Sequence, residues 1–229
     1  MLNLRADHAR AIDAVASEVA PDWPGRHGMI ELRSRAPTHD VYLQRPGLGR
    51  RLTSQSATEL RKIIAADRRS SRRGRGVKVK PSLMICVGDG LSAAAVVRNA
   101  LGLVRAVRSL ATHKYRLLPV FFVRHARVRI QDHIGAIAGV DVVCLLIGER
   151  PGLAMAESLS AYVIYRPTLK SREPDRSVVS NIHAGGLALH EGAAKITKLI
   201  DDMVAYRASG SKLASAIESA RMNPASKRT

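Results

Sequence analysis

Leu83–Ser92 has the sequence LMICVGDGLS, a short apolar run that ends in a Gly-Asp-Gly turn. A second apolar run, Val140–Ile147, ends in Gly-Glu-Arg-Pro-Gly at residues 148–152. Short runs rich in Val, Ile and Leu are typical of strands that are buried on both faces of a parallel sheet. In such sheets ligands bind outside the carboxyl ends of the strands, so both turns are candidate ligand sites.

The chain from Pro81 onward alternates strands of this kind with helices. Val97, Leu101 and Val104 mark a broad apolar face on the longest of these helices. Strands that alternate with helices favour right-handed βαβ units. We therefore predict an α/β fold, Rossmann-like and doubly wound, with a mainly parallel sheet. Strands are expected at 83–87, 117–123, 140–147 and 160–165, and helices at 91–112, 130–138 and 190–208.

The first part of the chain has a different pattern. Apolar residues recur at helical spacing from Ala9 to Val19, and Pro21 ends that helix. Two period-2 runs, 29–33 and 40–44, predict a β-hairpin, and a serine-capped helix is expected at 54–66. The expected organisation is an N-terminal helix, hairpin and helix (1–67), a basic linker or loop (68–80), a Rossmann-like domain (81–209) and a basic tail (210–229).

The composition indicates a globular protein with an aliphatic core. Hydrophobic residues make up 46% of the 229 residues but aromatic residues only 3%, which suits an α/β packing. Cys86 and Cys144 lie inside predicted strands, so we expect buried free thiols and a reducing compartment. The sequence has neither an apolar stretch of the roughly 20 residues that a membrane span needs nor a signal-peptide core. We expect a cytoplasmic protein.

The net positive charge raises the question whether the protein binds nucleic acid. Lys and Arg number 37 against 19 acidic residues, a net charge of +18. Much of this excess lies in residues 68–80, which contain no acid, and after Gly210. Neither segment has interleaved aromatic residues on which bases could stack. A solvated basic surface is therefore favoured, and a non-catalytic basic module that binds a nucleotide or nucleic acid remains the alternative.

The two turns offer few chemical groups. The first lacks a full dinucleotide fingerprint, because Ala93 stands at the third glycine position. Asp89 is expected either to face a ligand or to cap the following helix. Glu149 is expected either to accept hydrogen bonds from a ligand or to form an ion pair with Arg150 or a neighbouring cation. No motif supplies a second acid, so we expect no catalytic residue in this chain.

Neither a metal centre nor a serine hydrolase is predicted from the remaining polar residues. His125, His133, His183 and His190 lack the spacing of metal ligands. Ser92 lacks the Gly-x-Ser-x-Gly elbow of hydrolases.

At five motifs the sequence resembles the small (light) chain of adenosylcobalamin-dependent ethanolamine ammonia-lyase. The similarity extends from about residue 5 to 208, and the order of the motifs makes it specific. The motifs are YLQRPGLGRRL (42–52), GDGLS (88–92), FFVR with ARVRI (121–124 and 126–130), LIGERPGL (146–153) and SNIH (180–183).

The resemblance implies a small subunit that completes an adenosylcobalamin site opposite a large subunit. The large subunit would bind ethanolamine, and the cofactor would support its radical conversion to acetaldehyde and ammonia. By motif, the implied cobalamin contacts fall on Val128, Glu149 and Val178. Val128 and Val178 would act through backbone groups and apolar contact, and Glu149 would accept hydrogen bonds.

Some positions depart from the family pattern. Relatives commonly have Ser at the position of Gly88, Cys or a similar residue at that of Val178, and an acidic residue at that of His133. A subunit that assembles without supporting turnover is therefore a further alternative. A bacterial microcompartment is the other location that the resemblance allows, although the sequence begins near the family's first helix without the longer N-terminal extension of many members.

Overall fold

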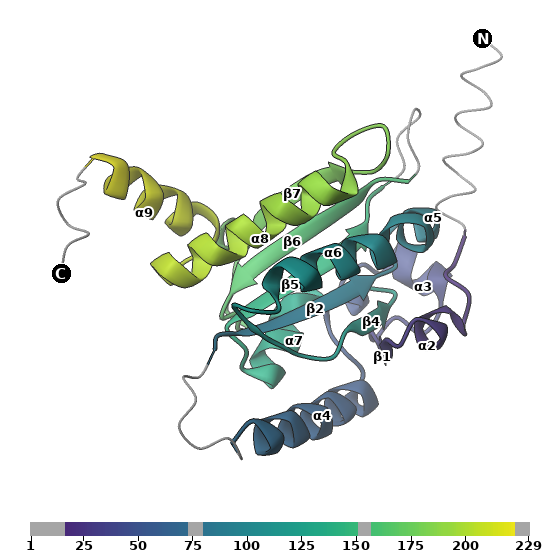
Figure 1. Ribbon diagram of the computed structural model, residues 1–229. Coiled ribbons are helices and arrows are strands. Elements are labelled where there is room, and N and C mark those ends of the chain that lie inside the picture. Colours follow the sequence, from purple (N-terminus) through teal and green to yellow (C-terminus); the bar gives the residue numbers. More distant parts are fainter. Residues whose placement is uncertain (1–16, 73–79, 151–156, 223–229) are drawn as a thin grey trace, which may run out of the picture.

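The structure is a computed structural model that describes residues 17–72, 80–150 and 157–222 (Figure 1). Within these residues the chain forms a seven-stranded sheet with the order β1-β4-β2-β5-β6-β7, and β3 pairs with β2 beside β4. The strands are β1 (Ile30–Arg33), β2 (Ser82–Gly88), β3 (Arg116–Leu117), β4 (Phe121–Arg124), β5 (Val142–Gly148), β6 (Leu159–Tyr165) and β7 (Ser177–Ile182).

The sheet is parallel over its first part and antiparallel at one edge. Strands β1, β4, β2, β3 and β5 pair in parallel, whereas β6 and β7 are antiparallel additions beside β5. The prediction of an α/β fold with a mainly parallel sheet is confirmed. Because β6 runs against β5, the start of β6 lies at the same edge as the carboxyl end of β5.

Helices cover both faces of the sheet (Figure 1). On one face Ile85 and Val87 of β2 pack with α6 (Leu101–Ala111) and α8 (Leu189–Tyr206). On the other face Met84 and Cys86 pack with α4 (Ser54–Arg72) and α7 (Ile130–Ala138). Successive residues of β2 therefore enter two different cores, which explains why the strand is apolar without alternation.

The predicted long helix is present, with an interruption near its start. It begins as α5 (Ala93–Ala95), widens into one π-helical turn, η2 (Val96–Ala100), and continues as α6. Ser92 caps it, because its Oγ accepts a hydrogen bond from the N–H of Ala95 at 3.1 Å.

The predicted N-terminal hairpin is wrong. Residues 40–44 belong to helix α3 (His39–Gln44), where Thr38 Oγ1 accepts a hydrogen bond from Val41 N–H at 3.3 Å. Strand β1 pairs instead with β4, in parallel. A run of five residues is too short to distinguish the period of 2 of a strand from the period of 3.6 of a helix. The hydrogen bond that Thr38 accepts at the start of this run favours the helix.

Two other differences concern strands. The predicted strand 117–123 is divided into β3 and β4 around Pro119, which has no N–H to donate to a ladder. Strand β7 was not expected from the sequence. It is an exposed edge strand whose residues do not follow a clear alternation.

The terminal segments and the basic segment are only partly described. Most of the first predicted helix lies in residues 1–16, outside the described residues. Helix α4 extends to Arg72, so the basic segment begins inside it, and residues 73–79 lie outside the described residues. The predicted basic tail begins as helix α9 (Gly210–Met222), which buries Leu213. The remaining short helices are α2 (Trp23–Arg26), η1 (Leu48–Arg50) and η3 (Glu173–Asp175).

Among the described helices, none combines the length and the apolar character that crossing a membrane requires.

Candidate functional site

A cavity of about 360 Å³ opens at the carboxyl edge of the parallel strands. Its walls are the turn after β2, the loop between β4 and α7, the end of β5, and the side chains of Tyr42 and Tyr162. Both turns that the sequence indicated therefore meet at one site. Three adjacent parallel strands end here, which is where ligands bind in open α/β sheets.

Glycines let the turns after β2 and β5 approach at the level of their backbones. Gly90 has a φ of +63°, and a Cβ on it would lie 2.2 Å from the carbonyl oxygen of Gly148. The N–H of Leu91 donates to that same oxygen at 3.1 Å. A side chain at position 88 would also be too close to its neighbour, because a Cβ on Gly88 would lie 2.8 Å from the Cβ of Ala126. Backbone atoms thus form this part of the cavity wall.

Asp89 is buried and holds the loop after β4. Its carboxylate accepts hydrogen bonds from the N–H groups of Gly90 at 2.9 Å, His125 at 2.6 Å and Ala126 at 2.9 Å. Burial raises the pKa of this carboxyl, and the three N–H donors oppose that shift. Asp89 therefore neither lines the cavity nor caps the helix, and Ser92 has the capping role.

Glu149 faces the cavity at the end of β5. Its carboxylate accepts hydrogen bonds from the hydroxyls of Ser158, at 2.9 Å, and Ser160. Within the described part of the chain, no ion pair joins Glu149 to Arg150 or to another cation. A carboxylate has about four acceptor sites, so Glu149 is oriented by two serines and can still accept hydrogen bonds from a ligand.

Of the three cobalamin contacts that the resemblance implied, Val128 and Glu149 line the cavity and Val178 does not. Val128 lines it from the loop between β4 and α7, and its N–H has no hydrogen-bond partner among the described residues. Val178 lies on β7, directly opposite Tyr162 of β6, and is 51% exposed. Directly opposed residues project from the same face of a sheet. Val178 therefore adjoins the Tyr162 wall, whereas Val128 and Glu149 face the cavity itself.

Sequence reasoning missed the pair formed by Tyr42 and Arg127. The guanidinium of Arg127 lies 4.2 Å from the centre of the Tyr42 ring, and its Nη2 donates to the Tyr42 carbonyl at 3.1 Å. The Tyr42 hydroxyl donates to the carbonyl of Ala126 at 3.0 Å, and burial raises its pKa. Arg127 Nε is buried and has no partner among the described residues. Both residues stand inside motifs of the resemblance, which was the available signal.

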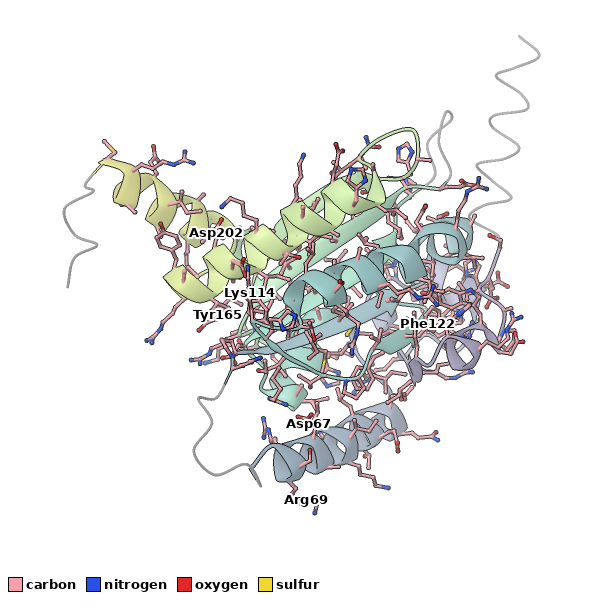
Figure 2. The ribbon with its side chains drawn as sticks, in the orientation of Figure 1. Asp67, Arg69, Lys114, Phe122, Tyr165 and Asp202 are labelled. Atoms are coloured by element: carbon pink, nitrogen blue, oxygen red, sulfur yellow. The ribbon has the colours of Figure 1, made fainter. Side chains whose placement is uncertain are left out.

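Part of the basic segment has a structural role. Arg68 donates to the carbonyl of Ala138 at 2.8 Å, at the carboxyl end of α7. Figure 2 shows Asp67 on the side of α4 that faces the sheet and Arg69 on the opposite side. Asp67 forms an ion pair with Arg116. These contacts fasten α4 to the domain, so this part of the positive charge is not evidence of nucleic-acid binding.

Comparisons with known proteins agree with this architecture. Residues 1–214 match the family model described as ethanolamine ammonia-lyase light chain. The ethanolamine ammonia-lyase small subunit of Clostridium perfringens is 38% identical over 210 residues, which are 91% of this chain and 67% of that protein. The small subunit from Listeria monocytogenes is 40% identical over 211 residues, which are 92% of this chain and 68% of that protein. The chain therefore belongs to the ethanolamine ammonia-lyase light chain family, the small subunits of a carbon–nitrogen lyase.

Proposed function

We propose that the cavity at the carboxyl edge of the sheet binds part of adenosylcobalamin, and that a large subunit completes the site. The observation that carries this proposal is the convergence of Val128 and Glu149 on one cavity, with Val178 beside its Tyr162 wall. They come from three separate segments of the chain. The resemblance selected them by motif, without reference to their positions in space.

The chemistry of the cavity suits such a ligand. Amide side chains of a corrin can donate to the Glu149 carboxylate, and a phosphate can accept from the Val128 N–H. The rings of Tyr42 and Tyr162 offer apolar surface to the ring system. A cavity of about 360 Å³ is near the lower limit for a drug-sized ligand. It can therefore take only one part of a cobalamin, which supports a second chain around the remainder.

In this proposal the chain binds and orients the cofactor. Ser158 and Ser160 hold the Glu149 carboxylate in position before the ligand arrives, so little side-chain entropy is lost on binding. The glycine contacts between the turns after β2 and β5 keep the backbone wall rigid. When bound, adenosylcobalamin supplies the radical chemistry that converts ethanolamine to acetaldehyde and ammonia. Ethanolamine itself would be bound mainly by the large subunit.

We place this reaction in the cytoplasm. Cys86 and Cys144 are both buried free thiols on neighbouring strands, and burial raises the pKa of Cys144 to about 12. Thiols held in this protonated state are inert core residues. They support the expectation of a reducing compartment and contribute no redox chemistry to the site.

The test is co-expression of this chain with its cognate large subunit, followed by purification and assay. Acetaldehyde formation from ethanolamine that requires both chains and adenosylcobalamin is the expected result. A stable complex without turnover would favour the degenerate subunit. Failure of the two chains to associate, together with salt-sensitive binding of DNA by this chain alone, would favour the basic binding module.

A further inference from the structure

Glu18, His39 and His125 converge beside the cavity from three separate parts of the chain. One ligand atom from each lies within 4.8 Å of the other two. Glu18 precedes α2, His39 begins α3, and His125 follows β4. We propose that these three side chains bind a divalent transition-metal ion of the Zn²⁺ class.

The hydrogen bonds of His125 prepare one of its ring nitrogens for such an ion. Nδ1 lies 3.0 Å from the carbonyl oxygen of Ala36, which can only accept, so Nδ1 carries the proton. In the neutral ring Nε2 then presents its lone pair. A backbone carbonyl on the other ring nitrogen is the usual arrangement around a metal-binding histidine.

Nε2 lies 3.4 Å from Glu18 Oε2. In the neutral ring with the proton on Nδ1, two acceptor atoms therefore lie next to each other. Zn–N and Zn–O bonds of about 2.0–2.2 Å at a tetrahedral angle separate two ligand atoms by roughly 3.4 Å. A bound cation would therefore satisfy both acceptors at the separation that the structure already has.

The backbone of His125 is held in an uncommon conformation. Its φ is +55°, a region that few residues other than glycine adopt, and its N–H donates to the buried carboxylate of Asp89 at 2.6 Å. The ring of His125 stacks on Tyr42, with centroids 5.8 Å apart. Strain of this kind persists where the surroundings fix it, and it is concentrated at functional sites. The imidazole is thus fixed by contacts on its backbone, on Nδ1 and on its face.

The donor set selects the class of ion. Two imidazoles and one carboxylate suit Zn²⁺ and its neighbours, whereas Ca²⁺ and Mg²⁺ prefer oxygen ligands alone. The centroids of the His39 and His125 rings are 6.1 Å apart, so the two imidazoles are neighbours. Three protein ligands leave a fourth position for water.

The ion would join the segment that carries Glu18 to the end of β4. It would act beside Tyr42, which lines the cavity, and thereby fix that wall. Sequence spacing gave no sign of this site, because 85 residues separate the two histidines and the fold brings them together. Its role is positional, and it is independent of the function proposed for the cavity.

The test is calorimetric titration of the chelator-treated full chain with Zn²⁺, with visible absorption of Co²⁺ as a second probe of the coordination. We expect Glu18→Gln, His39→Ala and His125→Asn each to weaken binding at this site by at least about tenfold. The matched controls His113→Ala and His190→Ala remove exposed histidines elsewhere and should bind like the wild type. Asn is chosen at position 125 because it tolerates a positive φ.

Two results would overturn the proposal. One is the absence of Zn²⁺ binding by the wild-type chain, which would leave His125 and Glu18 as a hydrogen-bonded pair that holds no ion. The other is binding that the three variants lower no more than the two controls do. Circular dichroism without metal verifies that each variant is folded. If His125→Asn fails to fold, the test rests on the variants of the half-exposed His39 and the exposed Glu18.

Discussion

The guanidinium of Arg176 binds both carboxylate oxygens of Asp132, in an ion pair that joins the start of β7 to α7. The two side chains are only 3% and 5% exposed. Burial raises the pKa of the Asp132 carboxyl, and Arg176 opposes that shift. Asp132 follows Val128 by four residues, and Arg176 precedes Val178 by two. The ion pair therefore links two of the segments from which the candidate site is built.

Breaking this ion pair should destabilise the fold. Arg176→Met leaves the Asp132 carboxylate buried without its main partner, and such a loss costs about 3–5 kcal/mol of unfolding free energy. Urea denaturation monitored by circular dichroism measures it. The double variant Arg176→Met/Asp132→Leu should recover much of the loss, because it removes both charges. A cost below about 1 kcal/mol for Arg176→Met would contradict a structural role for the pair.

The contact between the turns after β2 and β5 gives a second prediction. Gly90→Ala adds a Cβ 2.2 Å from the carbonyl oxygen of Gly148 at a residue whose φ is +63°. The positive φ alone costs about 1–2 kcal/mol, and the clash must also move one of the turns. We expect a lower unfolding free energy and weaker cofactor binding.

Gly25→Ala is the matched control for that variant. Nothing lies within 4 Å of a Cβ at position 25, and its φ is not positive. Its stability should stay within about 0.5 kcal/mol of the wild type, as for most surface substitutions. Equal stability of the Gly90 and Gly25 variants would show that the two turns do not need backbone contact.

Asp141 should make stability depend on pH. Burial raises the pKa of its carboxyl, but hydrogen bonds from Ser82 and Arg166 outweigh burial and hold it below the ordinary value. The carboxylate accepts from Ser82 N–H at 3.0 Å and from Arg166 Nη2 at 2.9 Å. A lowered pKa means that this stabilisation is complete above the unfolded value, near pH 4, and is lost as the pH falls through the folded value.

The corresponding variant is Asp141→Asn. It should lose about 1–2 kcal/mol at pH 7, and the difference from the wild type should shrink below about pH 4. Denaturation at pH 7 and near pH 3 measures both. Asp202→Asn, which removes an ion pair with the exposed Lys198, should change stability little at either pH. A loss for Asp141→Asn that is the same at both pH values would contradict the linkage.

The sequence predicted the central layer of this fold better than its ends. Strands β2 and β5 are buried on both faces, so their apolar runs carry an unambiguous signal. The hairpin prediction failed because residues 40–44 form a single short helix in which only Tyr42 is buried. Strand β7 was missed because an edge strand that is exposed on one side need not be apolar.

The candidate site likewise contains a residue that the local sequence could predict and contacts that it could not. Glu149 could be predicted because it directly follows a buried strand, and parallel strands end at one edge. The serines that orient it could not, because Ser160 lies in β6 and Ser158 directly before it, and the antiparallel direction of that strand was not apparent in the sequence. The stacking of Arg127 on Tyr42 joins residues 85 positions apart. Contacts of that kind depend on the completed fold.

The most direct test of the cavity as the cofactor site is the affinity of the assembled two-chain complex for adenosylcobalamin, measured with wild-type chain and with Glu149→Ala. Removing a charged acceptor should cost about 1.5–3 kcal/mol of binding free energy, a loss of roughly tenfold to a hundredfold in affinity. The control Glu191→Ala, at an exposed position on α8, should bind like the wild type. Unchanged affinity in Glu149→Ala, in a complex that is folded and assembled, would contradict the assignment.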